Sequence, residues 1–84
     1  MDIKDYVSLT KDSRSKKCIV YDIMGNEYSG IYDGDTFKNN VFSLCLILDP
    51  ATKEKLKNTG VERNKNGDVD ITIRVSAIQK IIFD

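Results

Sequence analysis

Short β-rich runs separated by turn residues fill the chain from Lys17 onward, and this spacing limits the possible folds more than any other feature. The runs predict strands at about residues 17–24, 27–33, 41–49, 69–75 and 78–83, because β-branched and aromatic residues dominate them. Gly25-Asn26 predicts a tight turn between the first two strands. Gly30, in mid-strand, indicates a bend or a close backbone approach. Strands this short favour a strongly bent sheet that closes on itself, so we expect an all-β, five-stranded small barrel.

The segment before the strands has a helical period instead. Its acidic residues come early and a lysine comes late, and its apolar residues are Met1, Ile3, Tyr6, Val7 and Leu9. This pattern predicts a short amphipathic α-helix at about residues 2–13. An isolated helix of this length is marginally stable, so it has to pack on the sheet. With 84 residues in all, residues 1–84 are expected to form one domain.

Two connections are polar. Residues 34–40 are expected to form a loop that carries one exposed aromatic side chain, Phe37. Residues 51–68 form a charged connection, in which residues 52–57 either extend the third strand or form a turn of helix. Within residues 53–65 the basic side chains outnumber the acidic ones by 5 − 2 = +3, counting Lys53, Lys55, Lys57, Arg63 and Lys65 against Glu54 and Glu62. This connection is either a solvated loop or a patch that steers phosphate groups.

The charge balance and the cysteines narrow the class of protein. Basic and acidic side chains number 13 each, giving zero net charge, so RNA contact would need a local basic patch or stacking. Cys18 and Cys45 stand alone in apolar runs, which favours buried free thiols and a cytoplasmic location. The first residues do not resemble a signal peptide, and no run approaches the ~20 apolar residues of a membrane span.

Catalysis has little support in the sequence. There is no histidine, no phosphate-binding loop and no nucleophile with an evident base. The spacing of Asp22, Asp33, Asp35 and Asp49 does not match a metal site or an acid–base pair. We therefore expect a binding protein without enzymatic activity, metal or cofactor.

Two stretches carry a family resemblance. The first is Ile19-Val20-Tyr21 followed by Gly25-Asn26-Glu27-Tyr28-Ser29-Gly30-Ile31-Tyr32, and the second is Ile73-Arg74-Val75-Ser76-Ala77-Ile78-Gln79-Lys80-Ile81. Together they resemble the Sm/LSm superfamily, and within it most closely the Sm-like domain of the ataxin family. The resemblance implies an Sm-like barrel behind an N-terminal helix. It also implies a non-catalytic, RNA-associated module in ribonucleoprotein assembly or RNA metabolism.

The same resemblance implies RNA contacts at two turns. The candidates are Asp35, Phe37 and Asn40 after the second strand, and Arg74 and Ser76 before the last. An exposed aromatic ring can stack a base for about 1–3 kcal/mol, and arginine offers a planar, permanent cation. The partners would be RNA or ribonucleoprotein proteins, with a homo- or hetero-oligomer forming through the terminal strands.

Two departures from the family pattern leave alternatives open. Val75 stands where the Sm pattern has glycine, and the spacing of Asp35, Phe37 and Asn40 differs by a residue or two. One alternative is a protein–protein interaction or oligomerisation module without RNA binding. The other is an oligomer that binds a small nucleotide between its subunits. In every case we expect Leu44, Leu46 and Ile73 in the core.

Overall fold

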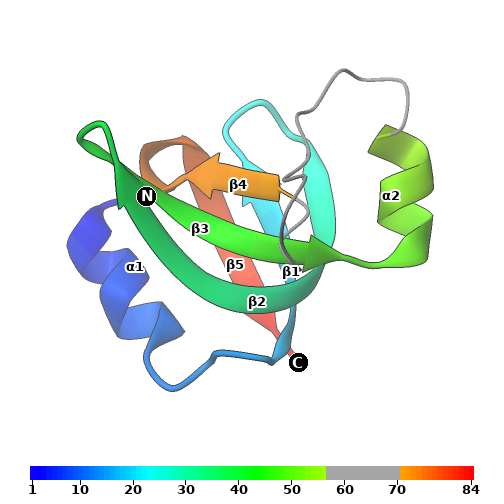
Figure 1. Cartoon of the computed structure of the whole chain (residues 1–84), viewed down its shortest axis with the longest axis horizontal. Helices are drawn as coiled ribbons and strands as arrows, with labels where there is room; N and C mark the ends of the chain where they lie inside the picture. The colour runs from blue at the N-terminus through cyan, green and yellow to red at the C-terminus, as the bar shows by residue number, and fades with distance from the viewer. Residues whose placement is uncertain (57–70) are drawn as a thin grey trace.

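Helix α1 lies at one end of a curved antiparallel sheet, and helix α2 lies at the other end (Figure 1). The computed structural model describes residues 1–56 and 71–84. The elements in chain order are α1 (Ile3–Thr10), β1 (Lys17–Asp22), β2 (Glu27–Lys38), β3 (Val41–Leu48), α2 (Pro50–Leu56), β4 (Ile71–Arg74), the 3₁₀ turn η1 (Val75–Ala77) and β5 (Ile78–Phe83). Neither α-helix of the described ranges is long and apolar enough to cross a membrane.

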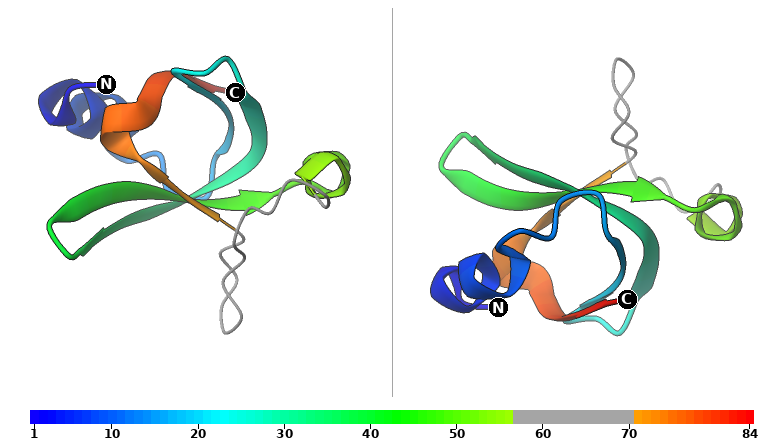
Figure 2. Two further views of the ribbon diagram at one scale, coloured as in Figure 1. Left: turned by 90° about the horizontal axis from the view of Figure 1, so that it is seen from above. Right: turned by 90° about the horizontal axis from the view of Figure 1, so that it is seen from below.

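The sheet is open. Its five strands follow the order β4-β3-β2-β1-β5 with antiparallel pairing throughout, so β4 and β5 form its two edges. Strand β2 curves strongly, and the β2–β3 hairpin projects from the rest of the sheet (Figure 2). The β-rich architecture and the N-terminal helix agree with the sequence prediction, whereas closure into a barrel is not confirmed.

Strand β2 corrects one prediction, because it runs through the segment expected as a loop. Its pairing with β3 shifts register between Tyr32 and Asp35 and then continues to Lys38. Gly34 lies in this irregular stretch with φ of 90°, a conformation that glycine adopts without a steric cost. The chain then reverses at Asn39 and Asn40, with φ values of 53° and 62°. Two successive left-handed residues form the kind of tight turn that suits a twisted hairpin.

The other boundaries differ by a few residues. α1 ends at Thr10 rather than near residue 13, and β1 ends at Asp22 rather than Met24. The fourth strand is described only from Ile71, because residues 69 and 70 lie outside the described ranges, and it ends one residue early where η1 begins. The segment expected as either strand or helix is helical. α2 starts at Pro50, which suits a first helical turn, and Asp49 Oδ1 accepts from the Thr52 amide at 2.8 Å.

The core confirms the predicted buried residues. Leu44 and Leu46 are fully buried and Ile73 is 9% exposed. Tyr6 is also fully buried, so α1 is anchored to the sheet by this face. Both cysteines are buried free thiols, as expected.

Candidate nucleic-acid interface

One shallow depression, of about 270 Å³, is lined by two turns that lie far apart in the sequence. One wall is the β2–β3 hairpin tip at Asn40, and another is the end of β4 with η1, at Arg74 and Ser76. Pairing of Ser43 with Arg74 fixes the second wall beside the first. The full lining is Met1, Ile3, Asn40, Val41, Phe42, Arg74, Val75 and Ser76. The structure thus brings three of the five predicted site residues together.

The start of α1 forms the third wall of this depression. The nitrogen of Met1 donates hydrogen bonds to the carbonyl oxygens of Val75 and Ile78, at 3.1 and 2.6 Å. These bonds hold the beginning of α1 against η1, so Met1 and Ile3 line the depression from that side. Three separate elements therefore define the shape of the site.

An aromatic pair stands beside the depression. Phe37 and Phe42 are cross-strand partners, and their ring centroids lie 6.5 Å apart. Phe42 also packs edge-on against Tyr6 at 5.4 Å, which fixes the Phe42 ring. Phe37 is 66% exposed, as the sequence predicts. Its free ring face is available for stacking next to the lining residue Phe42.

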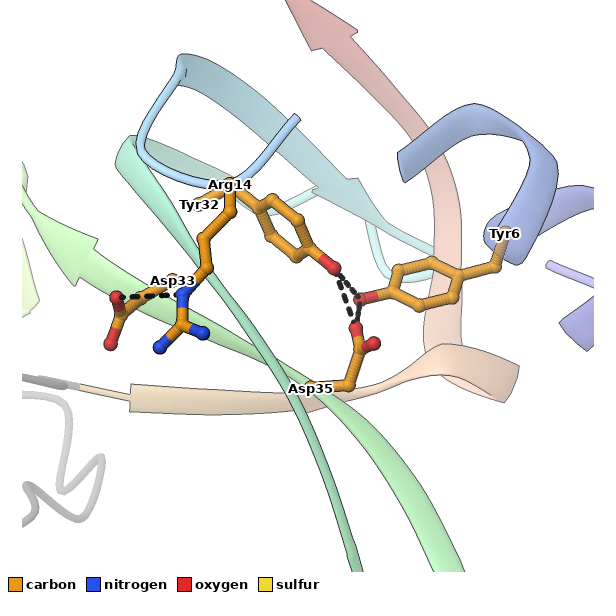
Figure 3. A network of polar contacts seen from close by, with 5 residues as sticks. All are labelled: Tyr6, Arg14, Tyr32, Asp33 and Asp35. Atoms are coloured by element: carbon orange, nitrogen blue, oxygen red, sulfur yellow. Dashed lines mark hydrogen bonds and ion pairs between the residues drawn. The ribbon is translucent and has the colours of Figure 1, made fainter. Parts of the chain in front are cut away.

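Asp35 does not line the depression, whereas Asn40 of the same hairpin does. Its Oδ1 accepts hydrogen bonds from the hydroxyls of Tyr6 and Tyr32, the latter at 2.8 Å (Figure 3). Burial and the hydrogen bond to Asp35 raise the pKa of Tyr6, and burial is also the main cause that raises the pKa of Tyr32. Both hydroxyls therefore stay protonated and donate to the carboxylate. Asp35 thus ties α1 to β2, a structural role for a residue predicted to contact RNA.

The side chains at the depression suit an anionic, planar ligand. Arg74 and Ser76 are exposed, and within the described ranges no carboxylate forms an ion pair with Arg74. A guanidinium can bind phosphate and stack on a base, while the Asn40 amide offers both a donor and an acceptor. Residues 1–56 and 71–84 contain no cluster of three metal-ligating side chains.

Sequence reasoning missed the apolar part of the lining. Val41 and Phe42 line the depression but are not among the predicted site residues. A signal for the hairpin was nevertheless present, since Phe37 and Phe42 stand symmetrically about Asn39-Asn40. Of the basic connection, Lys53 and Lys55 lie on α2, whereas Lys57, Arg63 and Lys65 lie outside the described residues.

No family model, curated protein or solved structure matches this chain. Functional interpretation therefore depends on the residues and geometry of the depression.

Proposed function

We propose that this protein is a non-catalytic, Sm-like module that binds RNA in ribonucleoprotein assembly or RNA metabolism. One observation carries the proposal: Asn40, Arg74 and Ser76 line a single depression beside the exposed ring of Phe37. A cation, polar side-chain groups and a stacking surface together are what single-stranded RNA recognition requires.

Arg74 is the residue we expect to contribute most. It ends a short strand, pairs with Ser43 and is followed directly by η1, so its backbone is held on both sides. A cation on a fixed backbone loses less conformational freedom on binding than a cation on an unconstrained segment would. With zero net charge on the whole chain, affinity per subunit should be weak.

The open sheet supports the oligomeric part of the proposal. β4 and β5 are its edges, and unpaired edges tend to recruit further strands. Pairing β5 of one subunit with β4 of the next is a heterologous contact, which forms a ring if the rotation closes. A ring would set several weak depressions side by side, and multivalency would then raise the overall affinity.

The test is fluorescence anisotropy with short uridine-rich and adenine-rich RNAs. We expect Arg74→Ala and Phe37→Ala each to raise the dissociation constant by about tenfold or more, within the 1–3 kcal/mol typical of stacking contacts. Lys80→Ala is the matched control, because Lys80 is a cation on β5 that lies over the Tyr21 ring at 4.7 Å, away from the depression.

A Lys53/Lys55/Lys57 triple alanine variant tests the basic connection. If the triple variant loses RNA binding while Arg74→Ala retains it, the depression is not the RNA site. If the parent protein binds no RNA, the interaction-module alternative replaces the proposal. Thermal stabilisation by mononucleotides alone would favour a nucleotide pocket between subunits.

A further inference from the structure

A second hollow, of about 520 Å³, lies on the sheet face opposite the core. Its apolar lining includes four isoleucines on four strands, Ile19, Ile31, Ile47 and Ile82, together with Cys18, Leu48 and Pro50. The strand register sets Ile19 beside Ile82 and Ile31 beside Ile47, and these two pairs lie on neighbouring strands β1 and β2; we call this hollow the isoleucine groove. Ile31 and Ile82 are 37% and 47% exposed. Apolar side chains gathered this way on a surface indicate a binding site.

The rim of the isoleucine groove is acidic. Asp49 and Asp84 line it together with Lys17, which gives a local charge of −2 + 1 = −1. A ligand that suits this groove would carry aliphatic side chains with a basic group next to them. An acyl chain with a carboxylate head group would meet two like charges here.

The exposed face of α1 has the complementary chemistry. Ile3 and Val7 are 53% and 52% exposed, and at a spacing of four residues they form one apolar row. Lys4 is also exposed and lies about 60° around the helix from Val7. Tyr6 and Thr10 are buried and lie on the adjoining part of the helix, about 60° from the centre of this row. The row on α1 is therefore presented to solvent by a helix already fixed in place.

A single chain cannot bring these two surfaces together. The isoleucine groove includes Asp49 and Pro50, where α2 begins, and α1 and α2 lie at opposite ends of the sheet (Figures 1 and 2). The contact has to form between two molecules. Because it joins two different surfaces, it leaves one groove and one helix free in each pair and can extend to further copies.

We propose that the isoleucine groove binds helix α1 of a second copy of this chain, with Ile3 and Val7 among the isoleucines and Lys4 beside Asp49 and Asp84. This contact differs from pairing at the β4 and β5 edges, since Ile31 and Ile47 belong to the inner strands β2 and β3. Ile3 also lines the depression proposed to bind RNA, so the two contacts share this residue, and the test of the present contact uses no RNA.

The isoleucine methyl groups offer a direct measurement, because both surfaces contain isoleucine. Spectra of methyl-labelled protein over a dilution series should show concentration-dependent shifts for Ile3, Ile19, Ile31, Ile47 and Ile82. Ile23 is 65% exposed on the β1–β2 turn and is the matched control that should not shift. Absence of concentration dependence would refute the proposal. Groove shifts without an Ile3 shift would refute α1 as the occupant.

Exchanging the charges at Lys4 and Asp84 tests how α1 is oriented in the isoleucine groove. The measurement is the average mass by light scattering at high micromolar concentration. Lys4→Glu and Asp84→Lys should each lower the average mass toward the 9.5 kDa of one chain, and mixing the two variants should restore association. Lys38→Glu makes the same charge change on the hairpin and should associate like the parent. Both key positions are exposed, so folding should be unaffected. Association unchanged in both variants, or no recovery on mixing, would overturn the assignment.

Discussion

Replacing Gly30 with alanine should destabilise this protein more than its small size change suggests. An added Cβ would lie 2.0 Å from the Ile47 carbonyl oxygen and 2.9 Å from both the Ile47 carbonyl carbon and Leu48 Cα. Ordinary carbon–oxygen contacts in sheets are about 3.3–3.6 Å, so the strands would have to separate by about 1.3 Å. The atoms in the way belong to the backbone and cannot rotate aside. Gly30 pairs with Leu48, so the separation would disturb the β2–β3 ladder itself.

Overpacking of this kind costs about 1–3 kcal/mol where side chains can adjust, and we expect at least about 2 kcal/mol here. For a chain of this size that corresponds to a fall in melting temperature of roughly 8–16 °C. Gly25→Ala is the control, since nothing lies within 4 Å of its added Cβ and only its φ of 87° opposes the change, at about 1 kcal/mol. Urea unfolding followed by circular dichroism measures both variants. A Gly30→Ala loss no larger than that of Gly25→Ala would refute the steric reasoning.

Three further predictions concern stability and reactivity. Leu46→Ala removes a fully buried side chain and should cost about 2–5 kcal/mol; an unchanged urea midpoint would place Leu46 outside the core. Burial raises the pKa of Asp22, but hydrogen bonds from Asn26, Tyr28 and Met24 outweigh it and lower the pKa below 3.8. Ionised Asp22 therefore stabilises the fold at pH values above 3.8, and this stability is lost as the pH falls through the folded-state pKa. In an acid titration, the unfolding free energy of Asp22→Asn should change less with pH than that of the parent protein. Burial raises the pKa of Cys18 to about 11, so its alkylation at neutral pH should be far slower in the folded protein than in urea.

Local pattern was sufficient for much of the fold. Alternation along β3 identified Leu44 and Leu46 as core, and Gly25-Asn26 marked the place of the first turn, which begins two residues earlier at Ile23, because these signals depend on neighbours in the sequence. The long hairpin was missed because its first arm beyond Gly34, residues 35–38, is polar apart from Phe37. Pairing with β3 and the Asn39-Asn40 turn hold this arm, and hydrophobic alternation reveals neither of them.

Non-local contacts explain the remaining differences. Asn40, Arg74 and Ser76 meet because both turns lie at the same place in the sheet, which the strand order determines. The hydrogen bond between Asp35 and Tyr6 of α1, 29 residues earlier, is also a contact that local sequence pattern does not reveal. Closure of the sheet likewise depends on pairing between distant strands, and a sequence pattern does not specify which edges meet.

The most direct test of the central proposal is to map where RNA touches the protein. Amide chemical shifts of labelled protein should be recorded during titration with a short uridine-rich RNA at physiological salt. We predict that the shifts cluster at Asn40, Val41, Phe42, Arg74 and Ser76, with little change on α2 or at the β1–β2 turn. Shifts centred on Lys53 and Lys55, or no shifts at saturating RNA, would contradict the assignment of this depression as an RNA-binding site.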